Sequence, residues 1–323
     1  IYTFALMKFI KILLILLIIN SCNNNKIEDA KIDIFRFDKE FAKLDDQTIN
    51  HLFADWDKNL DSFHYHYIQN FLPDYIVSND HLISFAKDTN VVLFNKELDS
   101  VFADYNQTVH KDLESAFGMM NYVLPHIRIP KNLITVNSFQ SYAMSTYGHT
   151  LVIGLDMYLG KENRFYNDYQ YLNFMKQKKF LLVDAIENWI NHIYEHSHNH
   201  DNFLDKLIYK GKIIYLLRKL LPDYPTHDIL KYTEEDIVNC EVSESVVWDE
   251  IMKQNYLYVS DYPMSYFTHS PSTKGFDDSP ARLGYFIGYK IVQSYMNHNN
   301  VSVSDLMENT DAQQILSASK YDP

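Results

Sequence analysis

The 323-residue chain is poor in cysteine and in positive charge. Two cysteines, Cys22 and Cys240, are too few for a disulfide framework or a cysteine-rich zinc module. Lysine and arginine total 29 against 42 aspartates and glutamates, which gives a formal net charge of −13. Because such a chain offers little positive charge to neutralise phosphates, we expect no nucleic-acid partner.

Other familiar signals are also missing. The sequence contains no G-x-G-x-x-G, no Walker-type loop, no G-x-S-x-G and no context typical of a catalytic cysteine, so we expect no cofactor. No Pro/Gly/Ser-rich linker interrupts residues 31–323, and no internal repeat is present. The chain is 46% hydrophobic, which is enough for one large core, and we predict a single globular domain.

The amino terminus has the pattern of an export signal. Residues 1–6 precede the first methionine, Met7, and we interpret them as upstream of the natural start. Two lysines then precede an apolar run over residues 12–19, which is too short to span a bilayer as a helix. The run ends at Ile-Asn-Ser-Cys, which resembles a bacterial lipobox with Cys22 as the acylated residue.

This signal predicts three segments. Residues 1–21 would be upstream sequence and lipoprotein signal peptide, residues 22–30 the lipidated Cys22 and its tether, and residues 31–323 the globular domain. Asn23 follows the cysteine where an Asp would favour retention in the inner membrane. We therefore expect an envelope protein anchored through its lipid to the periplasmic face of the outer membrane.

The mature chain reads as an α+β fold that is mostly α-helical and contains a small β-sheet. Residues 32–37 alternate like a strand that leads into a helix, and β-branched runs at 133–137 and 151–155 predict strands joined by a turn. Helical patterns cover 180–194, 203–221, 233–253 and 282–296. We predict that the last helix opens at Asp277–Pro280 and that its G-x-x-x-G, Gly284 to Gly288, packs against another helix in the core.

One histidine pattern could bind a metal. His192, Glu195 and His196 match H-x-x-E-H, which places two histidines on one helix face beside a glutamate that could act as a base. A third protein ligand is not evident, and the run His198–Asp201 continues as a polar loop. The ordinary interpretation is a solvated helix end; adventitious divalent-ion binding and a zinc metallohydrolase are the alternatives.

The carboxy-terminal half carries a family resemblance. The strings LIYKGKIIYLLRKLLPD at 207–223, SPARLGYFIGYKIVQSYM at 279–296 and ILSASKYDP at 315–323, with RFDKE at 36–40, resemble the gliding motility lipoprotein GldB family of Bacteroidota. The resemblance implies an envelope lipoprotein without established catalytic activity. Such a protein would support the gliding apparatus and the type IX secretion machinery linked to it.

The resemblance also implies a zincin-like scaffold that lacks its metal site. The active-site helix of the related predicted zinc proteases would fall on residues 186–190, where only Glu187 keeps its chemistry, and their later ligand would fall on Lys210. Neither isoleucine nor a lysine ammonium can hold zinc. Glu187, Trp189 and Lys210 therefore mark a candidate vestigial cleft.

Three functions follow as hypotheses. The first is a non-catalytic, lipid-anchored envelope protein that binds proteins of the gliding or secretion apparatus. The second is a zinc metallohydrolase that uses His192, Glu195 and His196. The third is a protein that binds an envelope peptide or glycan in the cleft near Glu187.

Overall fold

The computed structural model describes residues 27–167, 169–195 and 202–323. Its helices and strands are, in chain order, β1 (Asp33–Arg36), α2 (Phe37–Phe41), α3 (Ile49–Asn59), α4 (Phe63–Phe71), α5 (Asn79–Ala86), α6 (Thr89–Val101), α7 (Val109–Val123), β2 (Asn132–Val136), β3 (Met144–Tyr147), β4 (Thr150–Gly154), α8 (Gln170–Met175), α9 (Leu181–Tyr194), α10 (Phe203–Leu220), α11 (Thr226–Leu230), α12 (Glu234–Val242), α13 (Glu244–Lys253), α14 (Leu283–His298), α15 (Val303–Glu308) and α16 (Ala312–Ser319). The predicted mostly helical α+β fold with a small sheet is confirmed.

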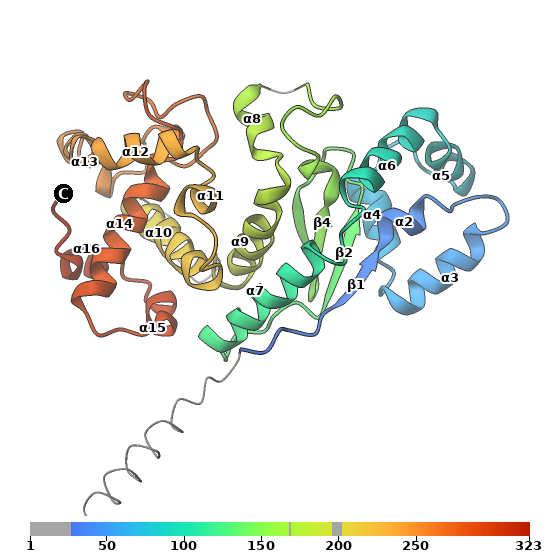
Figure 1. The fold of residues 1–323 in the computed structure, drawn as a ribbon, viewed down its shortest axis with the longest axis horizontal. Coiled ribbons are helices and arrows are strands. Elements are labelled where there is room, and N and C mark those ends of the chain that lie inside the picture. The colour runs from blue at the N-terminus through green and yellow to red at the C-terminus, as the bar shows by residue number, and fades with distance from the viewer. Residues whose placement is uncertain (1–26, 168, 196–201) are drawn as a thin grey trace, which may run out of the picture.

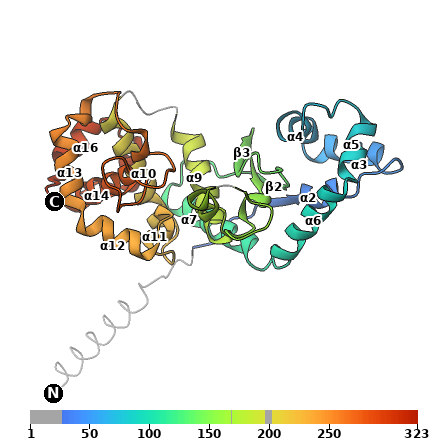
Figure 2. The ribbon, with the colours of Figure 1, turned by 90° about the horizontal axis from the view of Figure 1, so that it is seen from above.

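Three groups of elements follow one another along the long axis of the molecule. Figures 1 and 2 both show α2–α6 at one end, the sheet with α7 and α9 in the middle, and α10–α16 at the other end. Two clusters of buried side chains match this arrangement: a smaller one beneath α2–α5 and a larger one that runs from the sheet through the carboxy-terminal helices.

The sheet separates these two clusters. Its strand order is β1-β2-β4-β3, with β1, β2 and β4 parallel and β3 antiparallel to β4. Successive strand residues point to opposite faces, so Ile134, Val136 and Val152 join the smaller cluster, whereas Leu133 and Ile153 join the larger one. The predicted strands at 133–137 and 151–155 are confirmed as β2 and β4. The strand β3 lies where the sequence suggested only a turn.

One predicted helix is divided in two, and one predicted helix cap lies outside its helix. The helix predicted over 233–253 is divided at Ser243, whose hydroxyl and N–H both donate to the carbonyl of Asn239. The helix predicted over 282–296 is confirmed as α14, Leu283–His298, but the predicted cap at Asp277–Pro280 lies outside it. The carbonyl of Pro280 accepts a hydrogen bond from the Thr273 hydroxyl, and Arg282 has a left-handed φ of 68°. Neither Pro280 nor Arg282 is therefore part of the helix.

The helices α10 and α14 touch backbone to backbone. A Cβ on Gly288 would lie 2.1 Å from the carbonyl oxygen of Leu207, and a Cβ on Gly211 would lie 2.1 Å from that of Gly288. A Cβ on Gly284 would lie 2.7 Å from the carbonyl oxygen of Tyr266. The prediction that this G-x-x-x-G serves close packing in the core is therefore confirmed.

We expect Gly288→Ala to lower the free energy of unfolding by at least about 1–3 kcal/mol, because the added methyl group forces two backbones apart. Denaturant unfolding followed by circular dichroism measures the change. Asn297→Ala, at an exposed position of the same helix, is the matched control and should stay within about 0.5 kcal/mol of the native protein. Equal stability of the two variants would contradict the packing argument.

Candidate functional site

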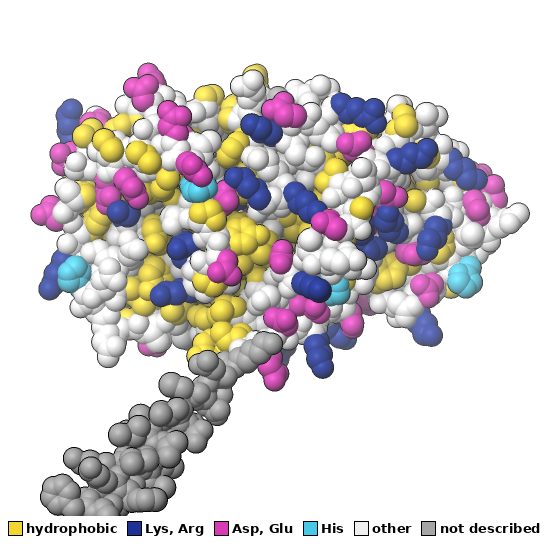
Figure 3. Space-filling model, in the orientation of Figure 1, with side chains coloured by type: hydrophobic (Ala, Val, Ile, Leu, Met, Phe, Trp, Pro, Cys, Tyr) yellow, Lys and Arg dark blue, Asp and Glu magenta, His cyan; other side chains and the backbone are white. Residues whose placement is uncertain are grey.

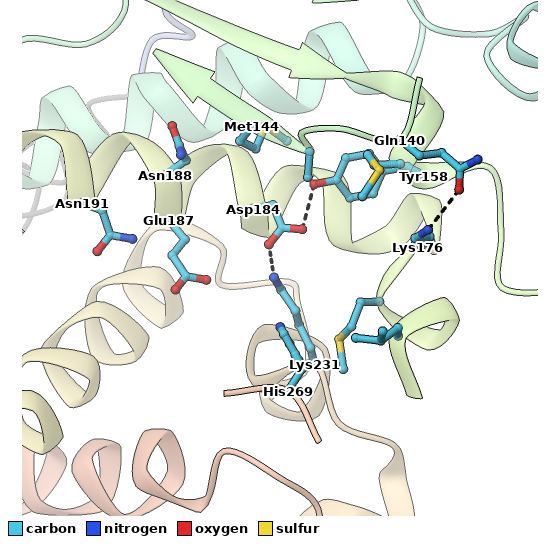
Figure 4. Close-up of a pocket in the computed structure, with 14 residues that line it drawn as sticks. Gln140, Met144, Tyr158, Lys176, Asp184, Glu187, Asn188, Asn191, Lys231 and His269 are labelled. Carbon is cyan, nitrogen blue, oxygen red and sulfur yellow. Dashed lines mark hydrogen bonds and ion pairs between the residues drawn. The ribbon is translucent and has the colours of Figure 1, made fainter. Parts of the chain in front are cut away.

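A cleft of about 540 Å³ opens where β2 and β4 end, between α9 and the segments that carry Lys231 and His269. Crevices at the carboxyl ends of parallel strands are common ligand sites, and this volume falls in the range of small-molecule pockets. Fourteen residues line the cleft (Figure 4). Four of them, Asp184, Glu187, Asn188 and Asn191, come from α9.

The first of these acids is neutralised inside the protein. Asp184 forms an ion pair with Lys231 and accepts a hydrogen bond of 2.8 Å from the hydroxyl of Tyr158, as the dashed lines of Figure 4 show. The two charged side chains are 17% and 9% exposed. The pair connects Lys231, the residue after α11, to α9. Removal of either partner would leave the other charge poorly solvated and would destabilise the protein.

The cations near the cleft shift the titration of its bases. Burial, and then the charge of Arg282, lower the pKa of Lys231 well below its ordinary value. Asp184 therefore supplies the negative charge that favours the ammonium form of this lysine. Desolvation, followed by the charges of Arg282 and Lys231, lowers the pKa of His269 to about 3. His269 is consequently neutral at physiological pH.

A loop after β2 shapes another wall. Phe139 and Gln140 both have positive φ, at 51° and 63°. The carboxylate of Asp156 holds this loop, because it accepts bonds of 2.6 Å from the backbone N–H groups of Ser138 and Gln140 and one of 3.0 Å from the Ser138 hydroxyl. Burial raises the pKa of Asp156 to about 6 against the opposing effect of these bonds.

The three residues of the predicted vestigial cleft do not come together. Glu187 lines the cleft. Trp189 is 1% exposed, and its indole N–H donates to the carbonyl of Arg128 at 2.9 Å, so it belongs to the core. Lys210 is half-buried on α10, with its ammonium over the rings of Tyr209 and Tyr285, and does not line the cleft.

The histidine pattern is only partly within the described structure. His192 is exposed, packs on the Trp189 ring at 5.1 Å and lies 3.4 Å from the Thr146 hydroxyl. Glu195 is exposed at the end of α9, and His196 lies outside the described residues. Over residues 27–167, 169–195 and 202–323, no group of three or more His, Cys, Asp or Glu side chains is placed to hold a metal ion.

Most of the residues that line the cleft were not predicted from the sequence. The polar positions 184, 187, 188 and 191 recur at helical spacing along an otherwise apolar helix, and helical periodicity could have revealed this stripe. Gln140, Tyr158 and Lys231 come from loops and turns far apart in the chain, and no local pattern signals that they meet.

The fold and the site define a mostly helical α+β protein with a ligand-sized cleft beside its sheet. The family model described as gliding motility protein GldB matches residues 20–323, and the chain belongs to this family. It is accordingly a lipoprotein of the cell envelope that is related to gliding motility. No curated protein and no solved structure matches the chain. The zincin-like relationship stays a prediction.

Membrane attachment can be examined only in part. Among the helices of the described ranges, none combines the length and apolar character needed to cross a bilayer. Cys22, the predicted lipidation site, lies outside these ranges.

We expect Asp184→Asn to lower the free energy of unfolding by about 3–5 kcal/mol at pH 7, because Lys231 then lacks its counter-ion. Burial already lowers the pKa of Lys231 in the folded native protein, and loss of Asp184 should lower it further. The unfolded chain keeps the ordinary lysine pKa, so the loss of stability is largest at a pH below the folded-state pKa of Lys231. The difference from the native protein should narrow as the pH rises toward 10. Denaturant unfolding between pH 6 and 10 measures it.

Asp74→Asn, at an exposed position, is the control and should remain within about 0.5 kcal/mol of the native protein at each pH. A difference between Asp184→Asn and the native protein that widens with rising pH would contradict the assignment of charges.

We expect the protein from residue 23 onward to hold well under one zinc per chain after dialysis against a mild chelator, because a catalytic zinc site needs three protein ligands. Elemental analysis measures the metal content. One tightly held zinc that disappears in both His192→Ala and His196→Ala would instead support the metallohydrolase.

Proposed function

We propose that this protein is a non-catalytic envelope lipoprotein that supports gliding or type IX secretion by binding partner proteins. Cys22 would attach it through lipid to the periplasmic face of the outer membrane. The observation that carries the protein-binding role is an apolar surface on α12 and α13. Family membership and the lipobox support the anchored location.

This surface, here named the valine surface, consists of Val238, Val242 and Val246. Their exposed fractions are 54%, 80% and 60%. Val238 and Val242 lie four residues apart and therefore share one face of α12, and Val246 follows in α13 after the break at Ser243. Exposed apolar patches are typical of protein-interaction sites, and we infer that the three valines form one such patch.

Acidic side chains surround the valine surface. Acidic residues outnumber basic ones seven to one over residues 233–253. Figure 3 shows hydrophobic and acidic side chains intermingled at the end of the molecule that α12 and α13 form. The partner that fits is a protein with an apolar strip flanked by lysine or arginine, because complementary charge guides association and rejects acidic competitors.

The valine surface is suitably placed for an anchored protein. In Figure 1, the chain segment that leads into β1 starts on the lower side of the domain, whereas α12 lies on the upper side. A lipid on Cys22 would therefore leave the valine surface facing away from the membrane.

The cleft supports the separate hypothesis of a peptide or glycan ligand, because its volume is large enough for a small ligand.

We expect Val242→Lys to reduce colony spreading in a gliding host whose own family member has been deleted, because the new charge would repel a basic partner. Val242→Asp should be the milder change, since its charge matches the surroundings. Val77→Lys, at a valine that is 77% exposed, is the matched control. Immunoblots establish equal protein levels.

Spreading at the native rate with Val242→Lys, or an equal loss with Val77→Lys, would contradict the assignment of the valine surface to partner binding.

A further inference from the structure

The cleft contains one carboxylate that the described protein does not neutralise. Glu187 has no hydrogen bond or ion pair with any described residue, whereas Asp184, one turn earlier on α9, is bound by Lys231 and Tyr158. Figure 4 shows Glu187 and Asn191 pointing to the same side of α9, toward Lys231 and His269. Glu187 is half-buried, so a cation bound there would be partly shielded from water.

The neighbouring cations are held by other groups. The guanidinium of Arg282 lies 3.9 Å from the centre of the Tyr285 ring and donates to the carbonyl of Leu230 at 3.3 Å. Its charge acts on Glu187 at longer range, without an ion pair. Lys176 lies at another part of the cleft, with its ammonium 3.4 Å from the Gln140 amide oxygen. The carboxylate of Glu187 therefore remains available to a ligand.

One amide lies beside this carboxylate, and a second points to the other side of α9 (Figure 4). The side-chain oxygen of Asn188 is buried, has no hydrogen-bond partner among the described residues and is out of reach of a ligand in the cleft. The side-chain oxygen of Asn191 accepts from the hydroxyl of Tyr209 at 2.9 Å, which orients the amide and leaves its NH₂ group to donate. Asn191 therefore offers a donor to a ligand bound at Glu187, and the carbonyl group of a peptide backbone can accept it.

The remaining lining is apolar and adaptable. Met144, Met157 and Met175 line the cleft together with Leu172 and Ala143. Methionine side chains are flexible and polarisable, and they accommodate apolar groups of different shape. This wall would accept the aliphatic neighbours of a charged residue without selecting one particular side chain.

We propose that the cleft binds a peptide segment that places a primary ammonium against Glu187, a backbone carbonyl against the NH₂ group of Asn191, and its apolar neighbours against the three methionines. The ammonium can come from a lysine side chain or from an amino terminus. This site is separate from the valine surface, so it does not depend on the proposed partner binding there.

Isothermal titration calorimetry with short peptides tests the proposal. The probe is acetyl-Leu-Lys-Leu-amide, and the same peptide with norleucine keeps the aliphatic chain but removes the ammonium. Leu-Leu-Leu-amide with a free amino terminus offers the other source. We expect the ammonium peptides to bind at least tenfold more tightly than the norleucine peptide, and their ratio identifies the preferred source.

Glu187→Gln keeps the size of the side chain and removes its charge. It should weaken the ammonium peptides to the level of the norleucine peptide while leaving the norleucine peptide unchanged, a pattern that misfolding would not give. Glu162→Gln, at an exposed glutamate outside the cleft, is the matched control and should change neither affinity.

Equal affinity for the lysine and norleucine peptides in the native protein would overturn the proposal, and so would the absence of measurable heat with every peptide at millimolar concentration. An identical loss in Glu162→Gln and Glu187→Gln would also overturn it. Val242→Lys should leave peptide binding unchanged, so failure at one site is distinguishable from failure at the other.

Discussion

The backbone contact between α10 and α14 at Gly211 and Gly288 is the constraint on which the cleft depends. It holds α14 against α10, and Arg282, the residue before α14, donates to the carbonyl of Leu230 at the end of α11. The next residue, Lys231, pairs with Asp184 of α9. One hydrogen bond and one ion pair thus connect the packing contact between α10 and α14 to the wall of the cleft.

The sequence predicts the fold where periodic patterns are long. The buried strands β2 and β4, the helices α9 and α10, and the capped start of α12 at Thr233 all follow from alternation, apolar stripes and capping residues. It does not predict β3, because Met144–Tyr147 carries no alternating pattern and is defined by its pairing with β4. Side-chain hydrogen bonds also affect helix boundaries, as the bond from the Ser243 hydroxyl to the carbonyl of Asn239 does between α12 and α13.

The candidate site is predictable only along α9. Glu187 was found through the family resemblance, and its neighbour Asn191 shares its side of one helix. Trp189 is adjacent in sequence but lies on the buried face, because successive helical residues point about 100° apart. Lys231 lies in the cleft because the chain turns toward α9 after α11. No local sequence pattern predicts this turn.

Charge connects the two proposed surfaces. Asp184 is neutralised by Lys231, which stabilises the fold, whereas Glu187 is half-buried without an ion pair to a described residue, and acids such as Glu234, Glu235 and Glu241 are exposed on α12. With a formal net charge of −13, the protein gains no electrostatic attraction from anionic lipid, so a covalent lipid would have to supply the attachment. The same negative charge favours the binding of cationic peptides and of proteins with a basic surface. Anchoring and recognition would then rest on separate physical forces, and changes in one would leave the other intact.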